Sequence, residues 1–186
     1  KKYFAPRTIK ELKKIIKKNK NAEFLSGGTD MSLVVTKQKK DIKNIIYLNS
    51  IDELNYIKEK DKYIEVGATT PLRKFEFIIK KYYPDFNRIL KRYGSVQIRN
   101  VATLAGNMAT ASPIGDSLPL LLSLDASVAI ESFNKKMIIS LKDFFIGYRK
   151  TRLKKGQFIR SIRIPIFKKN IFKAYKISKR IDDDIS

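Results

Sequence analysis

Apolar residues recur along this chain at two different spacings, which separates the predicted helices from the predicted strands. Thr8 and Glu11 are placed as in a capping box, and the helical spacing after them predicts a helix that extends to about Asn19. The same spacing predicts further helices from Pro71 onward with Thr70 as the cap, over 85–93 and over 117–124. Short apolar runs predict an extended start at 3–5 and strands at 23–26, 45–48, 63–66, 126–132, 137–139, 157–164 and 171–178.

One long segment, Ser95–Asp116, has neither helical nor alternating spacing, and small residues dominate it. Structureless loops of this length in compact domains are usually functional. Elsewhere helices and strands are mixed without a strict βαβ rhythm, which predicts an α+β fold. We expect two lobes of one domain, a small lobe over 1–53 and a larger lobe over 54–186.

The chain is strongly basic, since 40 Lys and Arg against 18 Asp and Glu give a net charge of +22 in 186 residues. A basic patch of that strength can attract nucleic acid. The lysines, however, occur in nearly every segment and form no single stripe with interleaved aromatic residues. This pattern favours a solvated lysine-rich surface, and a basic nucleic-acid-binding protein remains the alternative class.

Cysteine and histidine are both absent from the chain. It therefore has no disulfide, no thiolate or imidazole metal site and no cysteine ligands for an iron–sulfur cluster. Ser-His-Asp and Cys-His catalysis are excluded for the same reason. The longest apolar run, near 118–124, is too short to cross a bilayer, so we expect a cytoplasmic protein without membrane contact.

The first candidate binding motif is a predicted strand that runs into two glycines, a hydroxyl and an acid. Glycine allows positive φ and close approach of another group, and consecutive backbone N–H groups in such a turn can bind a pyrophosphate. A tight turn capped by Thr29 or Asp30 is the alternative that the segment alone leaves open. The motif consists of Phe24, Leu25, Ser26, Gly27, Gly28, Thr29, Asp30 and Met31.

The second candidate motif lies within 95–116. Its small residues would let a flat ring or a phosphate approach closely, while Thr103, Asn107 and Thr110 supply neutral hydrogen-bonding groups. Asp116 would be repelled by a phosphate, so as a cofactor ligand it should meet a hydroxyl or a ring N–H. Capping of the following helix is an equally good interpretation of Asp116.

These motifs resemble those of a known family. RNVATLAGN at 99–107 and TASPIGD at 110–116 are similar to the signature of the FAD-binding domain of molybdopterin dehydrogenases. That family includes the flavin parts of xanthine dehydrogenase, aldehyde oxidase, nicotinate dehydrogenase and carbon monoxide dehydrogenase. Over nearly the whole chain, further blocks resemble the family in the same order: YFAPRTIKEL, FLSGGTDM, VGATTPL, SLPLLLSLDASV, DFFIGYRKT, FIRSIRIP and YKISKRIDDDIS.

The resemblance implies a two-lobed FAD-binding domain of the PCMH type, with non-covalent FAD between the lobes. Segment 24–31 would wrap the pyrophosphate, Asp116 would make a polar contact to the cofactor, and Ile159 would pack on the flavin side. Lys176 would stabilise an anionic reduced flavin, and a surface lysine on a strand is its alternative interpretation. The remaining implied contacts are Tyr93 and a second flavin loop of Thr103, Leu104, Ala105, Gly106 and Asn107.

The resemblance also implies electron transfer rather than substrate oxidation. A molybdopterin subunit would oxidise the substrate, and 2Fe-2S clusters in another subunit would relay electrons. The flavin would collect these electrons and pass them to NAD+ or another acceptor. The chain itself would hold no metal and supply no catalytic residue, and its molybdenum partner would choose the substrate.

Two departures from the family pattern leave alternatives open. The second loop usually reads Gly-Gly-Asn, whereas this chain has Ala105-Gly106-Asn107, and a positive φ at Ala105 would cost roughly 1 kcal/mol. The chain is also expected to lack the family's C-terminal domain. A structural subunit whose flavin site has decayed is therefore one alternative, and a related flavoenzyme that acts alone is another.

Overall fold

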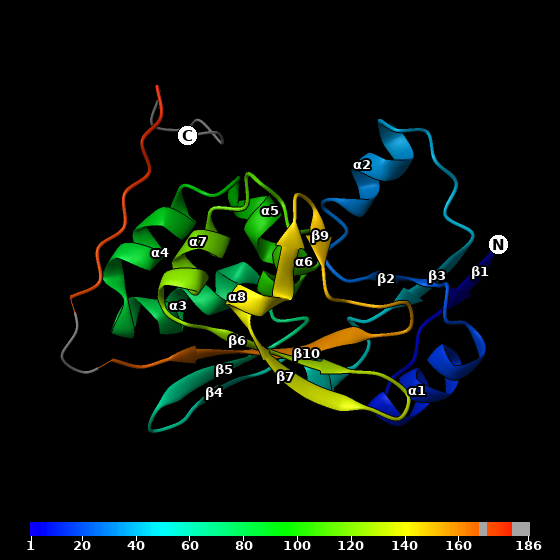
Figure 1. The fold of residues 1–186 in the computed structure, drawn as a ribbon. Helices are drawn as coiled ribbons and strands as arrows, with labels where there is room; N and C mark the ends of the chain where they lie inside the picture. Colours follow the sequence, from blue (N-terminus) through cyan, green and yellow to red (C-terminus); the bar gives the residue numbers. More distant parts are fainter. Residues whose placement is uncertain (168–170, 180–186) are drawn as a thin grey trace.

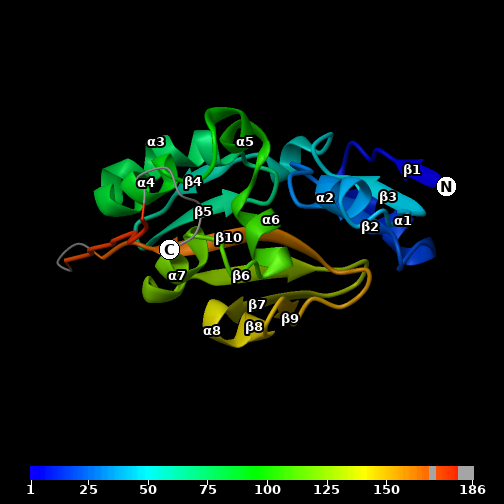
Figure 2. The same cartoon turned by 90° about the horizontal axis from the view of Figure 1, so that it is seen from above.

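The structure, a computed structural model, describes residues 1–167 and 171–179 and contains two principal β-sheets (Figure 1). A three-stranded sheet near the N-terminus lies beside a five-stranded sheet, and helices cover one face of the larger sheet (Figures 1 and 2). This arrangement confirms the predicted α+β class, with a small N-terminal lobe and a larger lobe. Residues 180–186 of the predicted second lobe lie outside the described residues.

The smaller sheet is parallel, and its first helix begins where the sequence predicts. The sheet order is β1 (Lys2–Phe4), β3 (Asn44–Tyr47), β2 (Glu23–Leu25), with α1 (Ile9–Lys18) between β1 and β2. Thr8 Oγ1 accepts a hydrogen bond from the Glu11 N–H at 3.1 Å, and the Glu11 carboxylate accepts one from the Arg7 N–H at 2.8 Å. The first bond satisfies one of the N–H groups that a helix start otherwise leaves unpaired, and the second fixes the residue that precedes the N-cap.

The larger sheet is antiparallel, and its central strand, β10, is the last described strand in the sequence. The sheet order is β4 (Ile57–Glu59), β5 (Tyr63–Gly67), β10 (Phe158–Pro165), β6 (Ser127–Glu131), β7 (Lys136–Ser140). The helices between β5 and β6 are α3 (Leu72–Tyr82), α4 (Pro84–Lys91), α5 (Val96–Val101), α6 (Leu104–Thr110) and α7 (Ser117–Ser123). The remaining elements are α2 (Met31–Thr36), the 3-10 helix η1 (Asp52–Leu54), α8 (Leu141–Phe144), β8 (Phe145–Gly147) and β9 (Lys150–Thr151).

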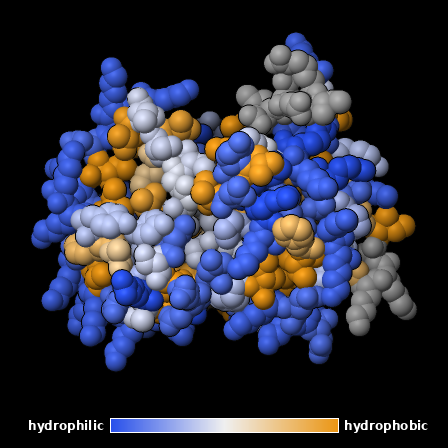
Figure 3. All heavy atoms as spheres, turned by 180° about the vertical axis from the view of Figure 1, so that it is seen from behind, coloured by the Kyte–Doolittle hydropathy of each residue, from blue (hydrophilic) through white to orange (hydrophobic). Residues whose placement is uncertain are grey.

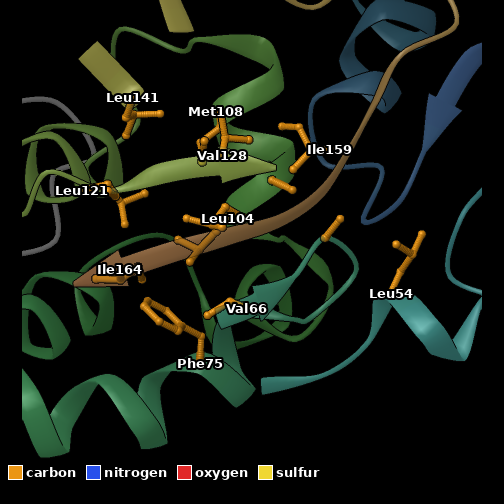
Figure 4. Close-up of a cluster of buried hydrophobic side chains, with 14 of the residues drawn as sticks. Leu54, Val66, Phe75, Leu104, Met108, Leu121, Val128, Leu141, Ile159 and Ile164 are labelled. Atoms are coloured by element: carbon orange, nitrogen blue, oxygen red, sulfur yellow. The ribbon is translucent and has the colours of Figure 1, made fainter. Parts of the chain in front are cut away.

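The core lies between the larger sheet and its helices (Figure 4). Val66, Val128 and Ile164 of the sheet are buried in one cluster with Phe75 of α3 and Leu104 of α6. Burial of a side chain of this size stabilises a fold by about 1.5–3 kcal/mol. Leu104 thereby anchors α6 to the sheet.

Contacts between the first lobe and the ends of two inner strands of the larger sheet, β6 and β10, hold the two lobes together. Lys13 Nζ in α1 lies 2.8 Å from Glu131 Oε2 at the end of β6, and the Glu131 side chain is only 9% exposed. The rings of Phe24 in β2 and Phe158 in β10 lie 6.2 Å apart. Because solvent screens a partly buried ion pair less than an exposed one, the Lys13–Glu131 contact is well placed to fix the angle between the lobes.

Part of the predicted loop over 95–116 is wrong, because its residues form α5 and α6. Both helices are short, at six and seven residues. Small side chains hide the helical spacing in α6, whereas the apolar residues of α5 are exposed and its buried residue is Arg99. Their starts follow the usual chemistry, since the hydroxyls of Ser95 and Thr103 accept hydrogen bonds from the N–H groups of Ile98 and Gly106.

Smaller differences from the predicted elements have local causes. Pro71 occupies the cap position of α3, and the Thr70 hydroxyl instead donates a hydrogen bond to the Tyr56 carbonyl at 2.9 Å. Helix α2 was not predicted because none of its residues is buried, so no apolar face marks it in the sequence. Strand β4 was not predicted either, since it is a three-residue edge strand with two exposed residues.

Residues 171–178 do not form the predicted strand. Their burial alternates as in a strand, but side chains of α4 rather than a neighbouring strand bind the backbone. The Ala174 N–H donates to the Asp85 carboxylate at 3.2 Å, and the Ala174 carbonyl accepts from Arg88 at 3.0 Å. The Lys176 carbonyl accepts from Arg92 at 3.1 Å. The segment is therefore extended but belongs to no sheet.

The surface agrees with the even distribution of lysines along the chain. Hydrophilic residues spread over most of the face drawn in Figure 3, and apolar residues are exposed between them. In the part of the chain that the structure describes, no helix combines the length and the apolar composition needed to cross a bilayer.

Candidate functional site

A cavity, partly open to solvent, lies where the two lobes meet. One wall is segment 24–31, which runs from β2 to the start of α2, and the other is α6 with the residues just before it. Phe158 and Ile159 line the cavity from the start of β10. The other lining residues are Leu48, Ala68, Ala102, Thr103, Ala105, Gly106, Asn107, Ala109, Thr110, Leu153 and Gln157.

Gly27 brings the two walls into direct contact. A Cβ at this position would lie 2.1 Å from the carbonyl oxygen of Val101 and 3.0 Å from the Cα of Ala102. No side chain fits at that distance, so the backbone contact requires glycine. The first glycine motif is thereby joined to the junction between α5 and α6.

The wall at 24–31 offers unpaired backbone donors. Gly28 has a φ of 75°, which favours glycine, and a Cβ there would approach only Leu25 within 4 Å. Among the described residues, no hydrogen bond uses the backbone N–H groups of residues 27–30. Consecutive N–H groups of this kind can receive the oxygens of an anion such as a phosphate.

In the opposite wall, at the start of α6, Gly106 has no side chain and so leaves space in the cavity. Thr103 Oγ1 accepts a hydrogen bond from the Gly106 N–H at 3.0 Å. A Cβ at Gly106 would meet only that hydroxyl oxygen, at 3.1 Å. Beside Gly106, Asn107 is almost fully buried, and its Oδ1 accepts a hydrogen bond from the Tyr93 hydroxyl at 3.2 Å. A ligand can therefore approach the α6 backbone closely.

Residues 1–167 match the model of a protein family described as the FAD-binding domain in molybdopterin dehydrogenase. The chain belongs to this family.

Relatives of this FAD-binding domain occur within longer proteins. The chain is 33% identical over 199 residues to xanthine dehydrogenase from Emericella nidulans, a match that covers 100% of this chain and 15% of that protein. It is 30% identical to the nicotinate dehydrogenase FAD-subunit from Eubacterium barkeri, with 78% of this chain and 50% of that protein covered. The chain thus spans at most about half the length of these relatives.

Solved structures confirm the fold of the FAD-binding domain. Carbon monoxide dehydrogenase from Hydrogenophaga pseudoflava superposes with a TM-score of 0.90 at 24% identity, covering 98% of this chain and 65% of that one. Quinoline 2-oxidoreductase from Pseudomonas putida 86 superposes with a TM-score of 0.89 at 23% identity, covering 99% and 65%. The two-lobed architecture expected from the sequence is therefore that of the family.

The lining of the cavity fits FAD. The unpaired N–H groups of 27–30 suit a pyrophosphate, which carries negative charge and only hydrogen-bond acceptors. Leu153, Phe158 and Ile159 provide an apolar surface on which a flat ring system can pack. Segment 24–31, four of the five residues of the second flavin loop, and Ile159 all line this one cavity, although they are far apart in the sequence.

Four of the predicted contact residues do not line the cavity. Leu104 points into the core, and Tyr93 lies behind Asn107. Asp116 and Lys176 contact each other: the carboxylate and Nζ are 2.7 Å apart, with the side chains 13% and 2% exposed. Lys176 is therefore not a surface lysine on a strand, and the Asp116 side chain does not cap α7.

Several lining residues were missed by sequence reasoning. Leu48, Ala68, Leu153, Gln157 and Phe158 come from strand ends and connections that contain no glycine pair or hydroxyl cluster. The block FIRSIRIP does begin at Phe158, which was the available signal for that residue. Within the described residues, no group of three or more acidic side chains is arranged to hold a metal ion.

Ala105, the departure from the family's Gly-Gly-Asn, is compatible with the local backbone. It lies in α6 and is not among the residues with positive φ, so the strain considered from the sequence does not arise. We expect Ala105→Gly to lower the stability of the protein by up to about 1 kcal/mol, because glycine is a poorer helix residue. FAD affinity should not improve. Thermal unfolding and FAD titration of the variant would test this, and a markedly tighter FAD complex would contradict it.

Proposed function

We propose that this chain binds FAD non-covalently in the cavity between the lobes and transfers electrons between iron–sulfur clusters of a partner and NAD+ or another acceptor. The observation that carries the proposal is the set of unpaired N–H groups at 27–30, placed opposite a wall that Gly106 leaves open. Membership of the FAD-binding domain family supports it.

In the proposed complex, the chain's own residues bind, orient and shield the cofactor. The N–H groups of 27–30 would donate to phosphate oxygens, and the close contact of Gly27 with Val101 would keep both walls at a fixed distance. Phe158 and Ile159 would exclude water from one side of the flavin ring. When bound, FAD supplies the redox chemistry, while the protein supplies binding and electrostatics.

The buried pair of Lys176 and Asp116 lies outside the cavity lining, and we propose that its charges act on the flavin through the protein interior. The Lys176 side chain is almost completely removed from solvent, so its ammonium acts through a less polar medium than water. A cation held there would favour a reduced flavin that carries negative charge. Asp116 opposes this effect in part, since it neutralises the same ammonium.

The proposed partners are a molybdenum-cofactor subunit and an iron–sulfur subunit in one hetero-oligomer. The solved relative from Hydrogenophaga pseudoflava is described as a carbon monoxide dehydrogenase that lacks the Mo-pyranopterin moiety of its molybdenum cofactor. A net charge of +22 would speed association with partners that present acidic surfaces.

The proposal is tested first by the absorption spectrum of the purified protein, with chromatographic identification of any flavin that denaturation releases. We expect a yellow protein that releases FAD at about one molecule per chain; release of FMN or of another cofactor would contradict the assignment. A folded, colourless protein that cannot be reconstituted with FAD would show that the cavity has lost its cofactor function. Reduction of the bound flavin by NADH, followed anaerobically, would then test NAD+ as the acceptor.

A further inference from the structure

Arg99 is a nearly buried cation that belongs to neither wall of the cavity. It lies in α5, and its side chain is 7% exposed. Its Nε donates to Glu76 Oε1 of α3 at 2.6 Å, and the Glu76 side chain is 4% exposed. Burial of two charges is tolerated when they are paired and their remaining hydrogen-bonding groups are satisfied. Arg73 satisfies the second oxygen of the Glu76 carboxylate, because its Nη1 lies 2.8 Å from Glu76 Oε2.

A first series of contacts connects the Arg99–Glu76 pair to Asn107, which lines the cavity. Arg99 Nη1 donates to the carbonyl of Gly94 at 2.6 Å and lies 3.3 Å from the carbonyl of Tyr93. The guanidinium thus holds the turn in which Gly94 has a φ of 59°. Tyr93 belongs to this turn, and its hydroxyl donates a hydrogen bond to Asn107 Oδ1 at 3.2 Å.

A second connection leads to the opposite wall. The helix that carries Arg99 ends at Val101, whose carbonyl oxygen is the atom that a Cβ at Gly27 would strike. The next residue, Ala102, accepts a hydrogen bond from the Leu72 N–H at 2.8 Å, which ties the helix end to the start of α3. The position of α5 therefore sets how closely the wall at 24–31 approaches α6.

We propose that Arg99 is a positioning residue for the flavin site, acting through Tyr93 and Asn107 on one wall and through Val101 and Gly27 on the other. The inference rests on the proposed function. A guanidinium can donate to Glu76 and to the Gly94 carbonyl at the same time because its donors form a rigid planar fork. A lysine ammonium keeps the charge but lacks this fork.

The test is Arg99→Lys in the full chain, with FAD affinity measured by titration and stability measured separately without FAD. We expect the dissociation constant for FAD to rise about tenfold, the lower end of the loss that removal of outer-shell partners causes at metal sites. The visible band of any flavin that still binds should also broaden, because its surroundings become less uniform. Unchanged affinity and an unchanged band in Arg99→Lys would overturn the proposal.

Arg163→Lys is the matched control. Arg163 on β10 also donates its Nε to a carboxylate, Glu65 Oε2, at 3.2 Å, but it lines neither wall of the cavity. We expect this variant to lose some stability and to bind FAD as the wild type does. If both arginine variants weaken FAD equally, Arg99 has no specific role and the proposal fails.

A second variant covers the case in which Arg99→Lys does not fold. Replacement of both members of a buried ion pair by apolar residues is often tolerated, so Glu76→Leu with Arg99→Met should remain folded. Weak FAD binding by this folded variant would support the positioning role, and wild-type affinity would refute it. Failure of the proposed function is distinguishable, since the wild-type chain would then bind no FAD.

Discussion

Replacement of Gly27 by alanine is expected to abolish FAD binding and to lower the melting temperature. The added Cβ would lie 2.1 Å from the Val101 oxygen and 2.7 Å from the Val101 carbonyl carbon. Both atoms belong to the backbone, so no side chain can rotate away, and the two walls of the cavity must separate. Overpacking typically costs about 1–3 kcal/mol, and a clash with rigid backbone should lie at the upper end of that range. FAD titration and thermal unfolding would measure the two effects.

Gly147→Ala is the matched control for Gly27→Ala. Gly147 lies in β8, and a Cβ there would have its nearest neighbour at 4.0 Å, the flexible side chain of Lys150. This variant should bind FAD and unfold as the wild type does. Gly28→Ala should fall between the two, because only its φ of 75° opposes a side chain. Normal FAD affinity in Gly27→Ala would mean that the contact of the walls does not shape the site.

Replacement of Lys176 by methionine is expected to make the bound flavin harder to reduce. The variant removes a buried cation and leaves the Asp116 carboxylate without this partner, so both changes disfavour added electrons. For a two-electron couple, each 1.4 kcal/mol of lost stabilisation lowers the potential by about 30 mV, and we expect a shift of at least that size. Redox titration of the FAD complex would measure it.

Two further variants distinguish the effect of the Lys176 charge from general damage to the fold. Asp116→Asn should shift the potential in the opposite direction, because it removes the negative charge and retains the cation. Lys173→Met changes an exposed lysine on the same extended segment and should leave the potential unchanged. If Lys176→Met has the potential of the wild type, the buried pair has a structural role and Lys176 does not tune the flavin.

The elements that were predicted correctly are those whose signals are local. Helix α1 begins at its capping pair, and four of the five strands of the larger sheet follow short apolar runs, as at Tyr63–Gly67. Helix α6 escaped prediction because Ala and Gly replace large side chains on its buried face. Helix α5 escaped because its apolar residues are exposed and its buried residue is Arg99, so no apolar face marks it in the sequence. Segment 171–178 has the alternation of a strand, but the sequence could not show that Asp85 and two arginines occupy its backbone groups.

The candidate site was predictable to the extent that its residues form continuous blocks. Segment 24–31 lines the cavity throughout, since a strand that ends in two glycines is visible in the sequence. Leu153 and Gln157 were not predictable, because only the folded chain brings the connection before β10 to the cavity. The pairing of Lys176 with Asp116 likewise depends on tertiary contact across the helical layer.

The central position of β10 in the larger sheet has a consequence for how the chain folds during synthesis. Strands β5 and β6 do not pair with each other; each pairs with β10, which leaves the ribosome after both. Until then the nascent chain exposes two apolar strands with open edges, a state prone to association with other chains. A net charge of +22 spread over the sequence would make such incomplete chains repel one another. The abundant lysines would thus protect the unfinished protein as well as solvate the finished one.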